Sequence, residues 1–333
     1  MPEAYLKGGP LVGGSRPGPR NVRVASPGGV RSPCMAGAWT RTLARIGLGR
    51  GVSPVRWARW GPLSRVLGAV VPLARPAVLI LSLPRSGSSW VGSVLGRSGA
   101  SLYLREPMTQ TTLAVEGADR RERLVDTPVW RDAARDAFRG LPRYRRRIVV
   151  DPAQWRLRVR RGRRVVVKEV TPSALPWLQE RFAPRVVFLV RHPAAVASSV
   201  RALGWNAVED ATEMAWWAGE ADRQARVLGA CLDRLTGRDD ATLVRYEDLC
   251  TTPVEGFREL HAFARLPWTE AAAAGVLAET TSEESYEVGG FDLQRDSRRM
   301  VDRWKQLLTA EQRRVMAQAW LAHDLPLYPV ADW

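Results

Sequence analysis

The stretch Leu81-Ser-Leu-Pro-Arg-Ser-Gly-Ser-Ser-Trp-Val-Gly-Ser-Val-Leu95 decides the fold class of this chain. The continuously apolar residues 77–83 lead into it and predict a buried β-strand. A polar turn over 84–89 follows, and residues 88–98 favour a helix. A strand, a Gly/Ser turn and a helix start are typical of a backbone that cradles a phosphate. The stretch therefore predicts an anion site at the end of a strand in an α/β fold.

The chemistry of this loop differs from that of nucleotide triphosphatases, whose loop ends in Gly-Lys-Ser/Thr, because it contains no lysine. Gly87 lets backbone N–H groups turn toward one anion, and the helix that follows adds the positive end of its dipole. Arg85 supplies a fixed positive charge, and Ser88 and Ser89 supply hydroxyl groups. The loop alone leaves open which anion it binds.

A second strand–helix junction repeats this arrangement further along the chain. Residues 185–190 read Arg-Val-Val-Phe-Leu-Val and predict a strand, after which come Arg191 and His192. Ser199 lies eight residues after Arg191, about two helical turns on if Pro193 starts a helix. The spacing predicts that a guanidinium and a hydroxyl meet at a second anion; an arginine on a loop and a solvent-facing serine are the alternative.

Strands and helices alternate along the rest of the chain. Strands are expected at 77–83, 101–105, 164–169, 185–190 and 241–245, with the first and fourth as central neighbours. Helices are expected at 88–98, 129–139, 173–182, 193–202, 209–235, 253–265, 270–279 and 309–323. This alternation predicts an open, mainly parallel α/β sheet.

The two anion motifs together resemble those of sulfotransferases that use 3′-phosphoadenosine 5′-phosphosulfate (PAPS), in particular carbohydrate-type and bacterial small-molecule sulfotransferases. A third segment, Leu243-Val-Arg-Tyr-Glu-Asp-Leu249, is similar to that family's Arg-Tyr-Glu-Asp-Leu segment. The resemblance covers about residues 77–310. It implies a P-loop-like three-layer fold with a central parallel sheet flanked by helices, in a sulfotransferase domain over 76–333.

The resemblance also implies the residues that bind PAPS, with no metal. The 5′-phosphosulfate loop corresponds to Arg85, Ser86, Gly87, Ser88, Ser89 and Trp90, and the 3′-phosphate pair to Arg191 and Ser199. Tyr246 corresponds to the tyrosine near the adenine. Ser297, Arg298 and Trp304 correspond to a late loop that closes over the 3′-phosphate. One departure is His192, where the family often has aspartate.

A base is needed for the acceptor hydroxyl, and Glu106 is the residue we expect to serve as that base. It directly follows the strand at 101–105, so its carboxylate lies at a strand end beside the loop. Carbohydrate-type family members have a glutamate–proline in the same relative place. The three histidines, His192, His261 and His323, are poorly placed, and we expect the last two in helical segments at the surface. The alternative for Glu106 is a structural ion pair with an arginine.

Lys168 is the third expected catalytic residue, with Glu106 and Arg85. The chain has only three lysines, Lys7, Lys168 and Lys305, among its 50 basic residues. A lysine late in the strand at 164–169 therefore predicts a need for a slim ammonium group, to reach the sulfate or to orient Glu106. Snorkelling from the strand end is the alternative.

The acceptor is expected to be a hydroxyl of a small molecule, a glycan or a glycolipid. Residues 119–165 hold sixteen arginines against six acids, which fits either an anionic acceptor or a solvated helix face. Trp130 and Trp155 in the same region would either stack on a sugar or pack in the core.

The net charge of +16 raises a rival function, nucleic-acid binding, and the loop raises another, a kinase or nucleotide triphosphatase. Residues 1–76 carry twelve basic residues and one acid, or +11, which leaves +5 for the rest of the chain. Because most of the excess charge lies outside the α/β region, we expect no nucleic-acid partner. A kinase would need a loop lysine, and it would leave the pairing of Arg191 with Ser199 unexplained.

The first part of the chain, 1–75, is expected to be a basic extension. Residues 1–34 have the Gly/Pro/Ser/Arg composition of disorder, and Met35 is an alternative start. Residues 38–75 suggest short basic amphipathic helices, which either contact a membrane peripherally or pack on the main domain. Three scattered cysteines and the lack of a signal-peptide pattern predict a cytoplasmic protein.

Overall fold

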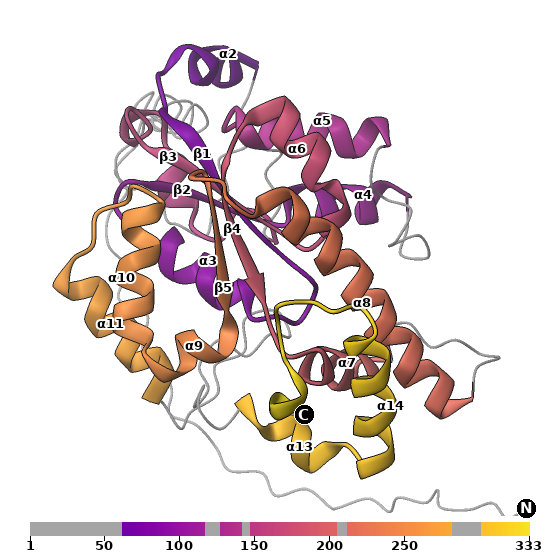
Figure 1. Ribbon diagram of the computed structural model, residues 1–333. Helices are drawn as coiled ribbons and strands as arrows, with labels where there is room; N and C mark the ends of the chain where they lie inside the picture. Colours follow the sequence, from indigo (N-terminus) through magenta and orange to yellow (C-terminus); the bar gives the residue numbers. More distant parts are fainter. Residues whose placement is uncertain (1–61, 117–126, 142–146, 205–211, 282–300) are drawn as a thin grey trace, which may run out of the picture.

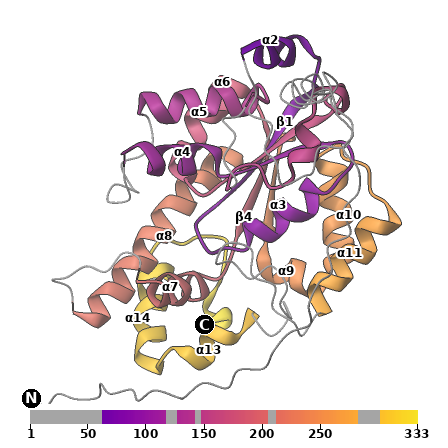
Figure 2. The same ribbon diagram turned by 180° about the vertical axis from the view of Figure 1, so that it is seen from behind.

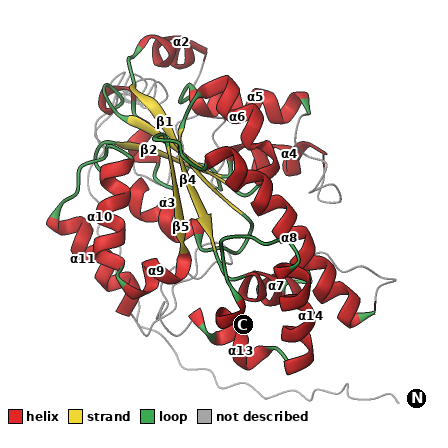
Figure 3. Ribbon diagram, in the orientation of Figure 1, coloured by secondary structure: helices red, strands yellow, loops and turns green. Residues whose placement is uncertain are grey.

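The computed structural model describes residues 62–116, 127–141, 147–204, 212–281 and 301–333. Its centre is a five-stranded sheet with helices on both faces (Figures 1 and 3). The strands are β1 (Ala74–Ser82), β2 (Ser101–Arg105), β3 (Arg164–Glu169), β4 (Arg185–Val190) and β5 (Ala241–Arg245). Their order is β2-β3-β1-β4-β5, and every pair is parallel. The predicted parallel α/β sheet is confirmed, with β1 and β4 as central neighbours.

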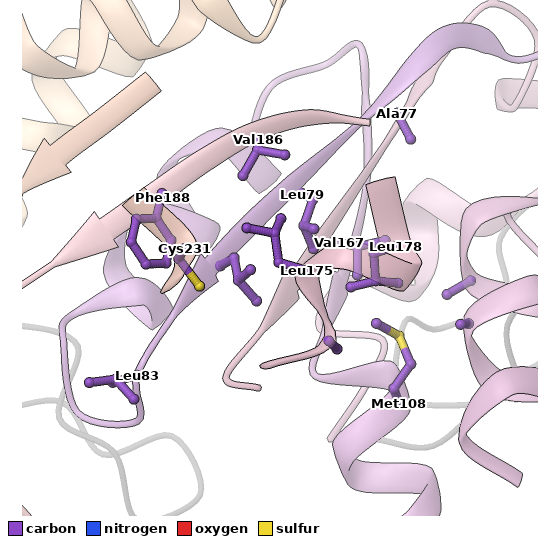
Figure 4. Close-up of a cluster of buried hydrophobic side chains, with 14 of the residues drawn as sticks. Ala77, Leu79, Leu83, Met108, Val167, Leu175, Leu178, Val186, Phe188 and Cys231 are labelled. Atoms are coloured by element: carbon purple, nitrogen blue, oxygen red, sulfur yellow. The ribbon is translucent and has the colours of Figure 1, made fainter. Parts of the chain in front are cut away.

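Alternating strand residues build two cores, one on each face of the sheet. Leu79 and Leu81 of β1 face the first core, where α5 (Pro128–Phe138), α6 (Leu175–Phe182) and α8 (Glu213–Leu235) pack. Figure 4 shows part of this core, with Leu175 and Leu178 against the strands. Val78 and Ile80 face the second core, covered by α3 (Ser88–Gly96) and α10 (Pro253–Phe263). The central strands β1 and β4 contribute to both cores, which explains their long apolar runs.

The remaining helices extend these layers. The sheet is flanked by α4 (Pro107–Glu116) beside α5, by α11 (Glu270–Thr281) beside α10, and by the short α9 (Tyr246–Thr251) after β5. A third cluster joins α7 (Pro193–Ala202), α8, α13 (Arg303–Leu307) and α14 (Ala310–Leu321), at the end of the sheet where the strands terminate (Figures 1 and 2). Short 3₁₀ turns cover Pro152–Trp155, Leu157–Val159, Pro172–Ala174 and Val330–Asp332.

Most helix predictions are confirmed to within a few residues at each end, and α7 matches in full. The prediction at 173–182 covers a 3₁₀ turn and then α6. The helices α4, α9 and α13 were not predicted. The segment Pro107–Glu116 of α4 holds three threonines and lacks an amphipathic pattern. No local pattern in the sequence indicates its first turn, which is held by Glu169, the last residue of β3.

The described part of the N-terminal extension, residues 62–75, contains α2 (Pro62–Val70), which lies at the opposite end of the sheet from α7 and α13 (Figure 1). The Nε of buried Arg160 donates a hydrogen bond to Gly68 O at 3.1 Å, so this helix packs on the main domain. The strand β1 begins at Ala74, before the predicted domain boundary at 76. Residues 1–61 lie outside the described residues, and contact of 38–75 with a membrane stays a prediction. No helix within the described ranges is long and apolar enough to cross a membrane.

Candidate functional site

Each of the five parallel strands has a predicted functional residue or loop at its carboxyl end. They are the loop 83–87 after β1, Glu106 after β2, Lys168 near the end of β3, Arg191 after β4 and Tyr246 after β5. The strand β1 leads to α3 on one face, whereas its neighbour β3 leads to α6 on the other. Open parallel sheets bind ligands at the carboxyl ends of strands where the crossovers diverge in this way. The topology therefore gathers these residues at one edge of the sheet.

The backbone of the loop after β1 turns sharply to start α3. Arg85 has φ 69° and Gly87 has φ 90°, both in the left-handed region. A Cβ at residue 87 would lie 2.4 Å from a ring carbon of Tyr246, so the ring of that tyrosine packs directly on the glycine. The first N–H groups of a helix have no acceptor within the helix. Gly87 thus permits both the turn that begins α3 and the close approach of Tyr246.

The two anion motifs meet through side-chain contacts. Arg85 donates from Nε to Ser199 Oγ at 2.9 Å, and Arg191 donates from Nη1 to Arg85 O at 3.2 Å. The Arg191 guanidinium also lies over the Tyr246 ring, 4.4 Å from its centroid. The sequence assigned Arg85 and Ser199 to opposite ends of the expected ligand, and the structure joins them in one cluster. This cluster, Arg85, Arg191, Ser199 and Tyr246, is called the arginine cluster below.

The other loop residues differ in how far their side chains are buried. Ser86 and Ser88 are buried, and Ser82 donates from its hydroxyl to Ser88 Oγ at 2.8 Å. Ser89 is half-buried. Trp90 is buried in the second core, where its ring meets Phe257 at 4.8 Å between centroids. The structure thus shows Trp90 packing α3 on α10, and a direct contact of this residue with a ligand stays a prediction.

Glu106 forms an ion pair with a lysine rather than with an arginine. Its Oε1 accepts from Lys168 Nζ, and its Oε2 accepts from Gln110 Nε2 at 2.9 Å. Glu106 has φ 50°, and its backbone N–H donates to Lys168 O at 2.6 Å. Burial alone would raise the pKa of the Glu106 carboxyl, but the charge and hydrogen bond of Lys168, together with the hydrogen bond of Gln110 and the charge of Arg105, lower the pKa. The Lys168 side chain is 3% exposed, so it does not snorkel to solvent.

Glu169 is a buried carboxyl that sequence reasoning missed. Its Oε1 accepts from the backbone N–H of Met108 at 2.7 Å and of Thr109 at 3.2 Å, and its Oε2 accepts from Thr109 Oγ1 at 2.6 Å. Burial raises the pKa of Glu169 to about 7, although these hydrogen bonds act in the opposite direction. The bonds hold the first turn of α4 directly after Glu106. Its place beside Lys168 at the end of β3 was the sequence signal for it.

The histidines take structural positions. His192 caps α7, with Nδ1 accepting from Ala194 N at 3.3 Å, and burial, reinforced by nearby positive charges, lowers its pKa to about 3. His261 is fully buried and its Nδ1 lies 2.7 Å from Phe257 O, which corrects the expectation that it lies in a surface segment. The third, His323, pairs with Asp222 at 2.9 Å. Their ring nitrogens thus bond to Ala194, Phe257 and Asp222.

The remaining predicted residues divide into those outside the described ranges and those in the core. Ser297 and Arg298 lie outside the described residues, whereas Trp304 is buried against His192. Trp130 and Trp155 are each 1% exposed, so they pack rather than offer a surface for a sugar. Arg160, in the arginine-rich region, is buried and donates to backbone oxygens, among them Arg139 O at 2.8 Å. At least this arginine serves the fold. The described residues contain no group of three or more His, Cys, Asp or Glu that could hold a metal ion.

The chain matches the sulfotransferase family over residues 76–270. No curated protein matches it closely enough to be counted as a relative. Three solved structures are similar to it: the sulfotransferase domain of the curacin biosynthetic pathway, mouse sulfotransferase SULT7A1 complexed with PAP, and sulfotransferase STF9 from Mycobacterium avium.

The sequence identities to these structures are 17%, 14% and 15%, and the TM-scores are 0.44, 0.45 and 0.44, in the same order. The aligned regions cover 77%, 77% and 80% of this chain, and 100%, 87% and 81% of the other chains. The family match itself spans more than half of the 333 residues. This chain therefore belongs to the sulfotransferase family.

Proposed function

We propose that this protein transfers the sulfuryl group of PAPS to a hydroxyl group of a small-molecule, glycan or glycolipid acceptor. The observation that carries the proposal is the arginine cluster, which joins two guanidinium groups, a serine hydroxyl and a tyrosine ring at the strand ends. Two fixed cations beside a helix start favour a ligand with several anionic groups. The Tyr246 ring adds an aromatic surface of the kind that a nucleobase contacts.

The donors around the loop fit the chemical groups of PAPS. Arg85 and the start of α3 suit the 5′-phosphosulfate, and Arg191 suits the 3′-phosphate. Of the carboxylates at this edge, Glu106 is paired with Lys168, and the lysine charge offsets its repulsion toward an anion. When bound, PAPS would supply the sulfuryl group, and we propose that no metal takes part.

The catalytic roles follow from the charges at the same edge. In the proposed reaction a bond forms between the acceptor oxygen and sulfur, the bond between sulfur and the phosphate oxygen breaks, and the hydroxyl proton goes to the Glu106 carboxylate. Lys168 and Gln110 hold that carboxylate in place and ionised. Arg85 is the fixed cation that stabilises negative charge on the departing oxygen. Lys168 is a second cation at this edge, because its strand β3 lies between β2, which leads to Glu106, and β1, which leads to the loop.

Calorimetry with the purified full chain tests the cofactor class. We expect heat of binding with PAP, the product of PAPS, and none with ATP plus magnesium. The second step is incubation with labelled PAPS and an extract of the source cells, followed by mass spectrometry for products that have gained one SO₃ group. Binding of ATP plus magnesium without PAP would refute the proposal in favour of a kinase or nucleotide triphosphatase.

A further inference from the structure

Three residues near the end of the chain contact the strand ends that carry the arginine cluster. We name Tyr328, Asp332 and Trp333 the tail clamp. Tyr328 is fully buried and donates from its hydroxyl to Glu247 Oε2 at 2.9 Å. Asp332 Oδ2 accepts from Arg245 Nη2 at 3.1 Å. The Trp333 ring lies 4.6 Å from the His192 ring, edge to face.

These three contacts are made to chain neighbours of the arginine cluster. Arg245 and Glu247 flank Tyr246, and His192 follows Arg191. The tail clamp thus reaches the cluster through these neighbours, which makes Tyr328, Asp332 and Trp333 positioning residues.

The Glu247 carboxylate is the main link between the tail clamp and both strands. Its Oε1 accepts from the backbone N–H of His192 at 2.9 Å, directly after Arg191, and its Oε2 accepts from Tyr328. One carboxylate thus joins the end of β4, the end of β5 and the tail. Hydrogen bonds to a charged acceptor are stronger than neutral ones, so the loss of one partner has a measurable effect.

The ring of His192 is packed against three aromatic rings. Its ring is stacked on Trp304 of α13, with 4.1 Å between centroids and an interplanar angle of 11°. Tyr328 and Trp333 meet it edge to face. Because His192 caps α7, and α7 carries Ser199, this packing also fixes the helix that holds Ser199. Figures 1 and 2 show the end of the chain beside α7, α9 and α13.

We propose that the tail clamp positions Arg191 and Tyr246 for the 3′-phosphate and the adenine of the nucleotide. This inference rests on the proposed function. A guanidinium that binds a phosphate must be held within a fraction of an ångström of its productive place, and the residues behind it set that place. Here the residues behind it come from the last turns of the chain, remote in sequence from both motifs.

The test uses Tyr328→Phe, which removes one hydroxyl and keeps the ring packed under Arg245. We expect the Kd for PAP to rise roughly three- to thirtyfold, the usual range for residues that act through a network, while kcat at saturating PAPS stays near that of the unchanged protein. Tyr103→Phe is the matched control. It also removes a buried tyrosine hydroxyl, one without a hydrogen-bond partner in the described structure, and it lies in β2, away from the tail clamp.

A second variant, Asp332→Asn, covers the case in which Tyr328→Phe fails to fold, because Asp332 is partly exposed. It weakens the contact with Arg245 and should raise the Kd for PAP in the same direction. If the unchanged protein binds PAP and the variants bind it equally well, the inference is overturned while the proposed function stands. It is also overturned if Tyr103→Phe weakens binding as much as Tyr328→Phe does. If the unchanged protein does not bind PAP at all, both the proposed function and this role are refuted.

Discussion

At the scale of single residues, the site depends on how Glu106 is held. A carboxylate can serve as a base only if it is ionised, and the pairing with Lys168 keeps Glu106 in that form although it is mostly buried. The same pairing limits its strength as a base, because a lowered pKa means a lower affinity for a proton. The hydrogen bonds of Glu169 to Met108 and Thr109 fix the helix turn that follows Glu106. One ion pair and one buried carboxyl therefore set both the charge and the place of the proposed base.

The first prediction separates a carboxylate mechanism from a histidine mechanism. Glu106→Gln keeps the shape of the side chain and removes the proton acceptor, so kcat should fall by roughly 10²–10⁴-fold, the usual contribution of a general base. The affinity for PAP, measured by calorimetry, should hardly change. His192→Ala should do the reverse, because His192 is a neutral cap behind the arginine cluster. Near-normal turnover of Glu106→Gln on its acceptor would end the carboxylate proposal, and Lys168 would be the next residue to test.

The second prediction concerns Arg191. Its replacement by alanine removes a guanidinium that lies over Tyr246 and contacts the loop backbone. Charge-assisted hydrogen bonds contribute roughly 1.5–3 kcal/mol each, so PAP affinity should fall more than tenfold in calorimetry. The control is Arg226→Ala, which breaks an exposed ion pair with Asp222 on α8. If both variants bind PAP like the unchanged protein, Arg191 is not a ligand of the 3′-phosphate.

At the scale of elements, the junction of β1 and α3 is the part on which the site is built. The strand is buried on both faces, and the helix begins at a glycine in the left-handed region. Neighbouring elements complete the junction: α9 brings the Tyr246 ring against Gly87, and α7 brings Ser199 to Arg85. The geometry of the loop therefore depends on packing from two helices that lie far along the chain.

The third prediction tests this junction with Gly87→Ala. The left-handed conformation costs a non-glycine residue roughly 1–2 kcal/mol, and the new Cβ would in addition lie 2.4 Å from the Tyr246 ring. We expect a lower urea midpoint and weaker PAP binding. Gly99→Ala is the matched control, since a Cβ there meets nothing within 4 Å and its φ is not in the left-handed region. Equal behaviour of the two variants would mean that the loop tolerates a different backbone path.

At the scale of the whole molecule, two buried groups give stability opposite dependences on pH. The pKa of Glu169 is raised to about 7 in the folded state, so the folded chain holds its proton where the unfolded chain has released it. Its contribution to stability is thus complete below the unfolded pKa and is lost as the pH rises toward 7. His192, with its pKa lowered to about 3, behaves in the opposite way, and its unfavourable effect fades as the pH rises toward its ordinary value near 6.5.

The fourth prediction follows from these two windows. The free energy of unfolding, measured by urea titration between pH 4.5 and 7, is compared for the unchanged protein and for Glu169→Gln. The difference in favour of the unchanged protein should shrink as the pH rises. With His192→Asn, which retains a residue that caps helices, the difference should instead grow in favour of the unchanged protein. A difference that stays constant with pH for Glu169→Gln would show that its carboxyl is not protonated in the folded protein.

The sequence by itself determined the sheet and the loop, because both depend on local patterns. Continuous apolar runs such as 77–83 mark buried parallel strands, and the Gly/Ser turn with Arg85 marks an anion site. The second motif, Arg191 with Ser199, was also visible, because its residues share one strand–helix junction. These patterns carry the fold class and the family resemblance, and both are confirmed.

Only the tertiary structure decided which side chains meet. Lys168 and Glu106 lie 62 positions apart, and Arg85 and Ser199 lie 114 apart. The helix α4 was missed because its first turn is stabilised by Glu169 of β3, and the tail clamp was missed because it reaches His192 and Glu247 from the last turns of the chain. Hydrophobic periodicity reports which face of an element is buried, but it carries no information on its partner. That choice depends on the strand order β2-β3-β1-β4-β5, which brings the carboxyl ends of β2 and β3, and of β4 and β5, into contact.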